Sequence, residues 1–340
     1  MDMSLFEQLA AEYFGLNPVR VSEIGDGNVN NTAVVDCQEG AFVIQAINAS
    51  IFTQPADMMA NIELIVARQQ AFNLGSIEFR RSVDDAFIVV HDGSPWRCYR
   101  FVGGVATPPI LTREDAQSNA RAFGRFARAI DGLDLVEHLP GFHDFDRRMY
   151  AFDAAVEADS AGRLASSEAH VTELLAMVDR LRLASPFQAW LEVPTRNAHN
   201  DAKGPNCIIG AGRRTIIDLD TTMPGTVLSD IGELVRSSTR HLEEAGPEAL
   251  MAQVASTNRG FLAGYGGDLT EAEHDCMLLA GPLMTVENAV RFMADHLAGD
   301  PYYGAATPNQ NLERSISQLR LAERLVEAIE LATSGALGAA

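Results

Sequence analysis

Apolar side chains recur with two different periods along the chain, and the change of period divides the sequence into two regions. Residues 4–14 place Leu5, Leu9 and Phe14 on one face of a helix, with Ser4 available as its N-cap. Beyond this helix the spacing falls to two, which is typical of half-buried strands. In this first region, strands are predicted within 19–35 and at 41–47, 87–90 and 97–102, and a second helix at 57–74. The first hundred residues are thus expected to form an antiparallel sheet with one or two helices.

The segment GGVATPP at 103–109 interrupts both periods, because glycine and proline punctuate helices and strands alike, and it is predicted to be a connector. Beyond it, apolar residues recur at spacings of three and four, so the second region is expected to be mainly helical. The predicted helices lie at 114–130, 149–161, 167–183, 247–265, 271–297 and 312–332. One hairpin interrupts them, with strands at 207–209 and 215–219 around GAGRR.

Composition narrows the class of protein. With 340 residues, of which 47% are hydrophobic, the chain is longer than a single core usually serves, so two lobes or domains are expected. The formal charge of −20 argues against a nucleic-acid or anionic-membrane partner. No run approaches the roughly 20 apolar residues of a membrane span, and the N-terminus lacks an export pattern, so we expect a soluble, cytoplasmic protein. The sequence leaves its oligomeric state open.

The four cysteines are far apart in the sequence and lack the spacing of metal ligands, so we expect free thiols that are mostly buried.

The segment HNDAKGPN at 199–206, followed by IIDLD at 216–220, carries the candidate chemistry. Phosphoryl transfer needs a carboxylate near the attacking hydroxyl, and it needs oxygen ligands that hold Mg²⁺. Asp201 suits the first role, and Asn206 with Asp218 suits the second. Lys203 is expected to reach the γ-phosphate and to offset the charge that develops there.

With HxDxxxxN followed by IDxD, the chain resembles the aminoglycoside phosphotransferase family, which are protein-kinase-like kinases of small molecules. Within that family it is most similar to the N-acetylhexosamine kinases, through segments spread over nearly the whole chain. These segments are GDGNVNNT (25–32), FVIQAINASIF (42–52), MANIELI (59–65), WRCYRF (96–101), DLDTTMPG (218–225) and ENAVRFMADHLAGDPYY (287–303). The resemblance implies an α+β, bilobal protein-kinase-like fold, with a nucleotide-binding lobe at 1–102, a hinge at 103–110 and a helical catalytic and substrate lobe at 111–340.

The resemblance also implies ATP and Mg²⁺ as cofactors, and it implies further site residues. These residues are Gly25, Asp26, Gly27, Gln45, Phe101 and Val102 for the nucleotide, and Asn28, Arg291 and Tyr302 for a sugar.

Gln45, in FVIQ, stands where most kinases of the wider family have a lysine. A glutamine cannot supply a cation to the α- and β-phosphates. Two alternatives stay open: Gln45 hydrogen-bonds the nucleotide as a neutral group, or Mg²⁺, Lys203 and backbone amides meet the phosphate charge. In both cases Glu63, on the following helix, is expected to lack a lysine partner.

Several loop residues also have ordinary structural interpretations. His199 is expected to hold the loop through backbone carbonyls rather than to act as an acid or base. Asp220 is either a weak metal ligand or a residue that contacts the ligands without binding the metal itself. Asp230 is expected to brace the loop together with Arg236, the alternative being a helix cap.

On the predicted helix 271–297, Glu287, Arg291 and Asp295 share one face. They are either part of a substrate site or a surface stripe of ion pairs. His143 is expected to make a structural contact within the second lobe.

Three functions follow from these observations. The first is an ATP- and Mg²⁺-dependent kinase that makes an N-acetylhexosamine (GlcNAc or GalNAc) 1-phosphate, an activity implied by the resemblance. The second is a kinase of another small hydroxyl compound, such as an aminoglycoside, choline, homoserine or a different sugar. The third is a kinase fold that binds without catalysis, which Gln45 motivates but the complete Asp201, Asn206 and Asp218 set argues against.

Overall fold

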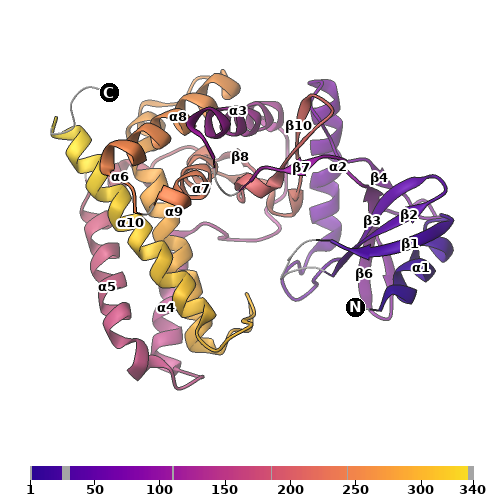
Figure 1. Cartoon of the computed structure of the whole chain (residues 1–340), viewed down its shortest axis with the longest axis horizontal. Helices are drawn as coiled ribbons and strands as arrows, with labels where there is room; N and C mark the ends of the chain where they lie inside the picture. Colours follow the sequence, from indigo (N-terminus) through magenta and orange to yellow (C-terminus); the bar gives the residue numbers. More distant parts are fainter. Residues whose placement is uncertain (1, 25–30, 109–110, 185, 243, 336–340) are drawn as a thin grey trace. The chain divides into compact units, whose positions relative to one another are not determined.

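The computed structural model describes residues 2–24, 31–108, 111–184, 186–242 and 244–335 (Figure 1). The chain divides into two compact units. The first, called here the N-terminal unit, consists of Met1–Val105, Leu133–Pro140 and Ile208–Thr221. The second, called the helical unit, consists of Ala106–Gly132, Gly141–Cys207 and Thr222–Ala340. The lobe boundaries implied by the resemblance stay a prediction.

The N-terminal unit is built on a six-stranded sheet in the order β1-β2-β3-β6-β4, with β5 also pairing with β6. Its strands are β1 (Pro18–Glu23), β2 (Thr32–Cys37), β3 (Gly40–Ala46), β4 (Phe79–Arg80), β5 (Val89–His91) and β6 (Ser94–Arg100). Every strand pair is antiparallel, as predicted. The alternation of buried and partly exposed positions along β2 shows why the period of two was visible in the sequence.

Helix α1 (Met3–Glu12) covers this sheet (Figure 1). Its Phe6 and Leu9 are buried in one cluster with Ile44 and Trp96. The predicted helix is therefore confirmed, but its N-cap is Asp2 and not Ser4, because the Asp2 carboxylate accepts a hydrogen bond from the Ser4 N–H at 3.0 Å.

Helix α2 (Pro55–Ala71) also belongs to the N-terminal unit and contacts the 3₁₀ turn Leu219–Thr221. The strands β9 (Cys207–Gly210) and β10 (Arg213–Ile216) form the predicted hairpin, in a small sheet with β7 (Val105–Ala106). The hairpin turn is shorter than predicted, because Ala211 and Gly212 adopt positive φ and reverse the chain in two residues.

The helical unit contains all the other described helices. They are α3 (Arg113–Ile130), α4 (Phe145–Ala158), α5 (Leu164–Leu183), α6 (Pro186–Trp190), α7 (Val227–Thr239), α8 (Pro247–Tyr265), α9 (Glu271–Ala298) and α10 (Gln310–Thr333). Helix α9 packs against α4, α5, α6, α7 and α10, and α10 runs alongside it in Figure 1. Buried side chains such as Phe152, Leu174 and Val286 form the main core of this unit.

Helices α3 and α8 approach each other through glycines. An added Cβ on Gly260 or Gly264 of α8 would overlap backbone atoms of Gln117 or Arg121, and one on Gly124 of α3 would overlap those of Phe261. The missing side chains thus let the two helix backbones pack in direct contact.

Helix α7 was only implied in the sequence by the interpretation of Asp230. Nearly all of its residues are buried, so it has no polar face to reveal a period of 3.6. Its N-cap is Thr226, whose hydroxyl accepts from the Leu228 N–H at 3.2 Å, and Asp230 lies inside the first turn.

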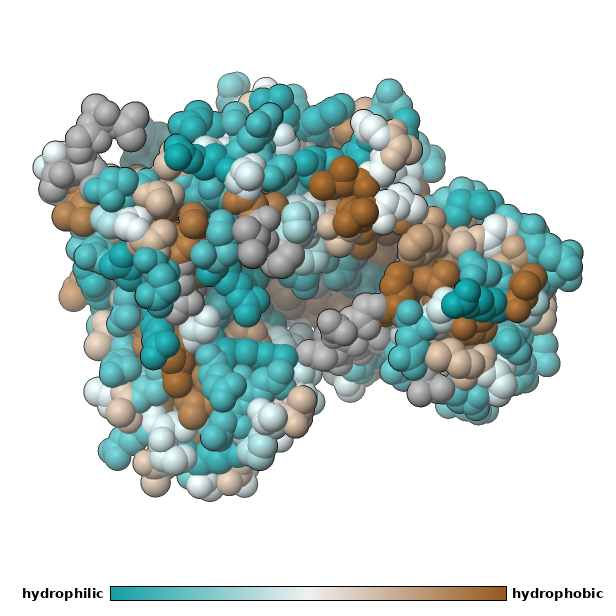
Figure 2. All heavy atoms as spheres, in the orientation of Figure 1, coloured by the Kyte–Doolittle hydropathy of each residue, from teal (hydrophilic) through white to brown (hydrophobic). Residues whose placement is uncertain are grey.

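The face seen in Figure 2 is largely hydrophilic on the helical unit, whereas the N-terminal unit shows apolar patches among hydrophilic residues. None of the helices in the described ranges is both long and apolar enough to cross a bilayer. All four cysteines are free thiols, and only Cys37 is more than marginally accessible, which confirms the prediction.

Candidate active site

In the helical unit, three predicted side chains come together in the loop that follows β8 (Arg196–Ala198). Oδ2 of Asp201 lies 2.6 Å from Nζ of Lys203 and accepts a hydrogen bond from Nδ2 of Asn206 at 3.0 Å. The side chains of Asp201 and Lys203 remain 25% and 38% exposed, so a ligand can reach both. The loop therefore presents a carboxylate, an ammonium group and an amide at one place.

The backbone of this loop is fixed from below by Asp230 of α7. Its two carboxylate oxygens accept hydrogen bonds from the His199 N–H (2.9 Å) and the Asn200 N–H (2.8 Å). Burial raises the pKa of Asp230, although these contacts and His199 oppose that shift. The predicted bracing role of Asp230 is confirmed, but Arg236 does not share it, because Arg236 pairs with Glu233.

Asn200, the residue directly before Asp201, adopts an unusual backbone conformation. Its φ of +62° lies in the left-handed region, which Asn tolerates better than most residues. Its amide nitrogen donates to the carbonyl oxygens of Ala198 and Met223, and its Oδ1 accepts from the Ser229 hydroxyl at 3.3 Å. Gly225 leaves the space for this amide, since an added Cβ would lie 2.5 Å from Oδ1. Such local strain, held by many contacts, is typical of functional loops.

His199 is fully buried and packs edge-on against Phe123 and Phe126. Its Nδ1 accepts a hydrogen bond from the Asp201 N–H at 3.3 Å. The predicted structural role is confirmed, with an amide N–H as the partner of this ring nitrogen rather than a carbonyl.

Asn206 is oriented as a metal ligand would be. Its amide nitrogen donates to the backbone oxygen and to Oδ2 of Asp201, so its amide oxygen faces away from Asp201. An amide oxygen together with a carboxylate suits a hard cation such as Mg²⁺. Within the described part of the chain, no three Cys, His, Asp or Glu side chains converge, so a site built from those residues alone does not occur there.

The second acidic segment belongs to the N-terminal unit. Asp218 is exposed and has a φ of +60°, whereas Asp220 is buried. The Asp220 carboxylate receives both terminal nitrogens of Arg97, at 2.7 and 2.8 Å. The same guanidinium donates to Oε1 of Gln45, whose Nε2 donates to the Thr32 hydroxyl. Sequence reasoning missed Arg97 because its partner is far away along the chain.

The remaining nucleotide residues are placed as follows. Phe101 and Val102 come directly after β6 and are partly exposed, and the Phe101 N–H donates to the Ala41 carbonyl. Glu63 pairs with Arg81 at 3.2 Å. The predicted residues Gly25, Asp26, Gly27 and Asn28 lie outside the described residues.

Arg291 and Tyr302, the predicted substrate residues, meet in the helical unit. The Arg291 guanidinium lies over the rings of Phe142, Tyr303 and Tyr302, at 5.3, 5.6 and 6.0 Å from their centroids. Burial alone would lower the pKa of Arg291, but Tyr303 and Glu287 outweigh it and raise that pKa, so the group is charged. These side chains form what is called here the arginine–aromatic cluster.

Glu287 and Asp295 do not form a surface stripe, because both are buried. Asp295 accepts hydrogen bonds from the backbone N–H groups of Tyr302 (2.8 Å) and Tyr303 (3.0 Å). It thus fixes the segment that carries both rings.

His143 joins the arginine–aromatic cluster to the catalytic loop. Its Nδ1 lies 2.8 Å from Oε1 of Glu287, and its Nε2 lies 2.7 Å from the Asn200 carbonyl oxygen. A structural contact was predicted for His143, but its partners were not. Arg148, which donates from Nε to the Phe142 carbonyl at 2.9 Å, is a second cation of this region that the sequence did not reveal.

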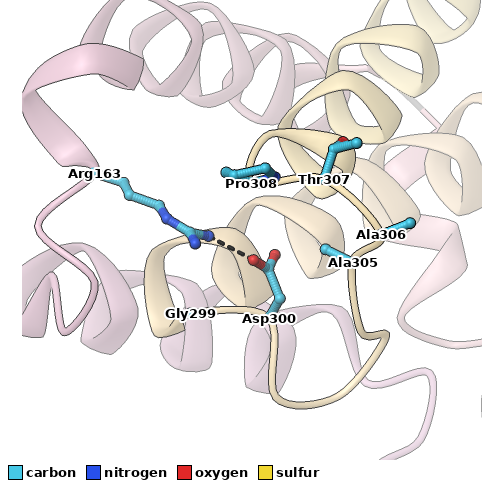
Figure 3. Close-up of a pocket in the computed structure, with 7 residues that line it drawn as sticks. All are labelled: Arg163, Gly299, Asp300, Ala305, Ala306, Thr307 and Pro308. Atoms are coloured by element: carbon cyan, nitrogen blue, oxygen red, sulfur yellow. Dashed lines mark hydrogen bonds and ion pairs between the residues drawn. The ribbon is translucent and has the colours of Figure 1, made fainter.

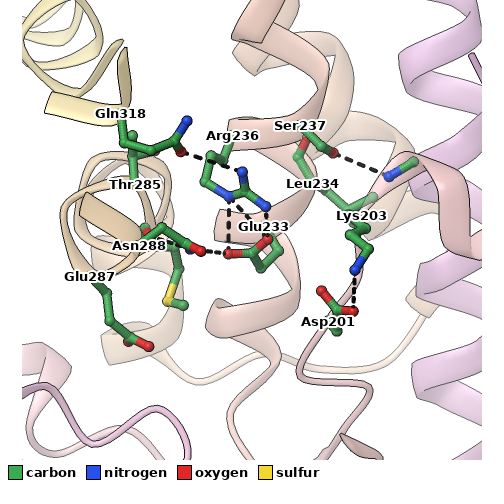
Figure 4. A network of polar contacts seen from close by, with 12 residues as sticks. Asp201, Lys203, Glu233, Leu234, Arg236, Ser237, Thr285, Glu287, Asn288 and Gln318 are labelled. Carbon is green, nitrogen blue, oxygen red and sulfur yellow. Dashed lines mark hydrogen bonds and ion pairs between the residues drawn. The ribbon is translucent and has the colours of Figure 1, made fainter. Parts of the chain in front are cut away.

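A buried network lies behind the loop (Figure 4). Arg236 pairs with Glu233, and Nδ2 of Asn288 donates to the same carboxylate at 2.7 Å. Burial alone would raise the pKa of Glu233, but Arg236 outweighs it and holds that pKa below its usual value. The Ser237 hydroxyl of the same helix accepts from the Gly204 N–H at 3.3 Å, which ties the network to the loop.

A pocket of about 410 Å³ lies elsewhere in the helical unit, near the end of α9 (Figure 3). The ion pair between Arg163 and Asp300, at 2.6 Å, forms part of its wall together with small side chains. No predicted site residue within the described ranges lines it.

A model of the phosphotransferase enzyme family matches residues 20–273, well over half of the chain. The chain belongs to this family. Spectinomycin phosphotransferase, solved in complex with ADP and spectinomycin, is 11% identical, with 97% of this chain and 99% of that chain covered and a TM-score of 0.64. An amicoumacin kinase in complex with AMP-PNP, Ca²⁺ and Ami is 13% identical, with coverages of 96% and 95% and a TM-score of 0.66. A microcompartment-associated aminopropanol kinase is 15% identical, with coverages of 96% and 98% and a TM-score of 0.63.

The α+β, kinase-like fold of this phosphotransferase is thereby confirmed, with its N-terminal antiparallel sheet and its helical C-terminal part. The chain is a small-molecule kinase, an enzyme that transfers a phosphoryl group to a hydroxyl. Identities this low establish the shared fold, and the acceptor has to be argued from the chemistry of the site.

Proposed function

We propose that this phosphotransferase transfers the γ-phosphoryl group of ATP to the anomeric hydroxyl of an N-acetylhexosamine. The observation that carries the proposal is that Lys203 Nζ and Asn206 Nδ2 both lie within 3.0 Å of the same carboxylate oxygen, Oδ2 of Asp201. Asp201 orients the acceptor hydroxyl and accepts its proton. Lys203 leaves Asp201 and pairs with a γ-phosphate oxygen instead. The free-energy change is small because a partly exposed ion pair contributes little to stability.

Mg²⁺ would be held by the amide oxygen of Asn206 and the carboxylate of Asp218, and when bound it neutralises phosphate charge. Gln45, Phe101 and Val102, together with Gly25, Asp26 and Gly27, are proposed to bind the nucleotide. The complexes of spectinomycin phosphotransferase with ADP and of amicoumacin kinase with AMP-PNP support a nucleotide donor.

The arginine–aromatic cluster supports a neutral acceptor. Aromatic faces stack on the apolar side of a sugar ring, and a guanidinium donates to hydroxyl or acetamido oxygens. A cationic acceptor such as choline would need free negative charge, but the Glu287 carboxylate is already paired with His143 and Arg291 carries a positive charge. Arg291 and Tyr302, with Asn28, are therefore proposed as sugar-binding residues.

The test is an ADP-release assay with Mg²⁺-ATP and a panel of GlcNAc, GalNAc, glucose, galactose, choline and an aminoglycoside. We expect release with an N-acetylhexosamine, none with its methyl glycoside, and a sugar 1-phosphate in the ³¹P NMR spectrum of the product. Turnover of choline or the aminoglycoside instead would overturn the neutral-acceptor argument. Release with the methyl glycoside would overturn the anomeric assignment.

A further inference from the structure

Gln45 and Arg97 face each other directly across two neighbouring strands. Gln45 on β3 is paired in register with Arg97 on β6. The Gln45 amide oxygen accepts from Nε of Arg97 at 2.9 Å and from Nη2 at 2.5 Å. The position that holds a lysine in most kinases therefore lies against a cation that comes from the adjacent strand.

This cation is fully engaged within the N-terminal unit. The Arg97 side chain is 4% exposed and that of Asp220 3%; Nη2 of Arg97 donates a hydrogen bond to Oδ2 of Asp220 at 2.8 Å, and Nη1 lies 2.7 Å from Oδ1 as an ion pair. A buried guanidinium and a carboxylate joined by an ion pair and a charge-assisted hydrogen bond interact more strongly than neutral hydrogen-bonding groups do. Both oxygens of Asp220 thus face Arg97, whereas Asp218, two residues earlier, is exposed.

The backbone of the same segment is held from the side of α2. Nε2 of His138 lies 2.7 Å from the Asp220 carbonyl oxygen, and its Nδ1 lies 3.2 Å from Nδ2 of Asn61 on α2. In protein kinases a lysine of the third strand pairs with a glutamate of the following helix. Here Glu63 of that helix pairs with Arg81, and the connection from α2 runs through Asn61 and His138.

We propose that Arg97 is a positioning residue that replaces the absent lysine: it fixes the Asp218–Asp220 segment to the sheet, with Asp220 as its counter-ion and Asp218 as the metal ligand of the segment. This inference rests on the proposed binding of Mg²⁺-nucleotide. It also explains Gln45, because a lysine there would place an ammonium group against the Arg97 guanidinium. A neutral side chain whose oxygen accepts two N–H groups fits instead.

The experiment measures binding without any acceptor, so it is independent of the sugar assignment. Affinities for Mg²⁺ with AMP-PNP, and for Mn²⁺ in the presence of AMP-PNP, are measured by calorimetry and by electron paramagnetic resonance. Melting temperatures are measured without nucleotide. The variants are Arg97→Gln, Arg97→Lys, Asp220→Asn, Gln45→Lys, the double variant Arg97→Gln/Asp220→Asn and the exchange Gln45→Lys/Arg97→Gln.

We expect Arg97→Gln and Asp220→Asn each to weaken metal binding by about 10- to 100-fold, as losses of residues behind a metal ligand commonly do. The double variant should be no weaker than either single variant, because both remove the same contact. Gln45→Lys should bind the metal–nucleotide more weakly than the exchange variant Gln45→Lys/Arg97→Gln does. It should also melt at a lower temperature than the exchange variant. Arg97→Lys keeps the positive charge but lacks the planar guanidinium, so its affinity for the metal should lie between those of the wild type and Arg97→Gln.

Additive losses in the double variant would show that Asp220 binds the metal itself and would overturn the proposal. Unchanged binding and melting in Gln45→Lys would overturn it as well. Wild-type protein that binds no AMP-PNP at all would instead refute the proposed nucleotide function, whereas coupled melting temperatures of Gln45, Arg97 and Asp220 variants would still report the contact.

Discussion

The Asp201 carboxylate contacts two polar side chains, those of Lys203 and Asn206. In Asp201→Asn, Lys203 and Asn206 remain, so nucleotide and metal binding should change less than about threefold. The acceptor hydroxyl loses its proton acceptor, and kcat should fall by about 10²- to 10⁴-fold. Steady-state kinetics measures the fall in kcat, and calorimetry with AMP-PNP measures nucleotide and metal binding. Asp153→Asn, an exposed aspartate of α4, is the matched control, and a kcat of Asp201→Asn near that of the control would contradict the assignment.

His143 provides a prediction about pH. Both of its ring nitrogens face acceptors, the Glu287 carboxylate and the Asn200 carbonyl oxygen, which requires two N–H groups. Burial alone would lower the pKa of His143, but Glu287 outweighs it and the pKa is raised, with Arg291 opposing. The stabilisation is therefore complete below the unfolded pKa of about 6.5, and it is lost as the pH rises through the folded pKa.

We therefore expect the melting temperature and kcat to fall as the pH rises from about 6.5 towards 9. The free energy of unfolding should fall by about 1.4 kcal/mol for each unit by which the pKa of His143 is raised in the folded state. In His143→Gln this dependence should flatten, because glutamine does not titrate. His274→Gln, an exposed histidine, should keep the wild-type profile. A ¹⁵N NMR spectrum that shows a neutral His143 ring at pH 6.5 would exclude the imidazolium.

At the scale of elements, the contact between α3 and α8 reverses an ordinary rule. Replacing a helical glycine by alanine usually stabilises a helix by about 1 kcal/mol. At Gly264 the added Cβ would overlap the Arg121 backbone, so Gly264→Ala should destabilise by about 1–3 kcal/mol.

Differential scanning calorimetry should show this as a drop of roughly 1–2 °C in melting temperature for each kcal/mol. Gly103→Ala is the control, because nothing lies within 4 Å of its added Cβ. A Gly264→Ala protein that melts above the wild type would show that the two helices have room to separate.

Elements with one buried and one exposed face are predicted correctly, and so is the long helix α9, although much of it is buried. Helices such as α3 and α10, and strands such as β2, follow their periods to within a few residues. Helix α7 escapes because it is buried on nearly all sides. The Asp2 cap and the two-residue turn at Ala211 depend on side-chain and φ details that periodicity does not report.

The grouping of Asp201, Lys203 and Asn206 was predictable because the three residues are neighbours in the sequence and therefore meet in one loop. The contacts that support them are not local: Arg97 and Asp220 are 123 residues apart, and His143 and Glu287 are 144 apart. Such pairs depend on the tertiary fold, and one sequence considered by itself contains no signal for them.

At the scale of the whole molecule, ligand binding raises the free energy of unfolding. A ligand that binds only the folded chain stabilises it by about 2.7 kcal/mol at a hundredfold excess over its Kd. If Asp218 is a metal ligand, ATP with Mg²⁺ should raise the melting temperature of the wild type well above ATP with EDTA. In Asp218→Ala that Mg²⁺-dependent increment should vanish, whereas Asp153→Ala should keep it. An increment of wild-type size in Asp218→Ala would remove Asp218 from the metal site, and Asn206 would then require another partner for the cation.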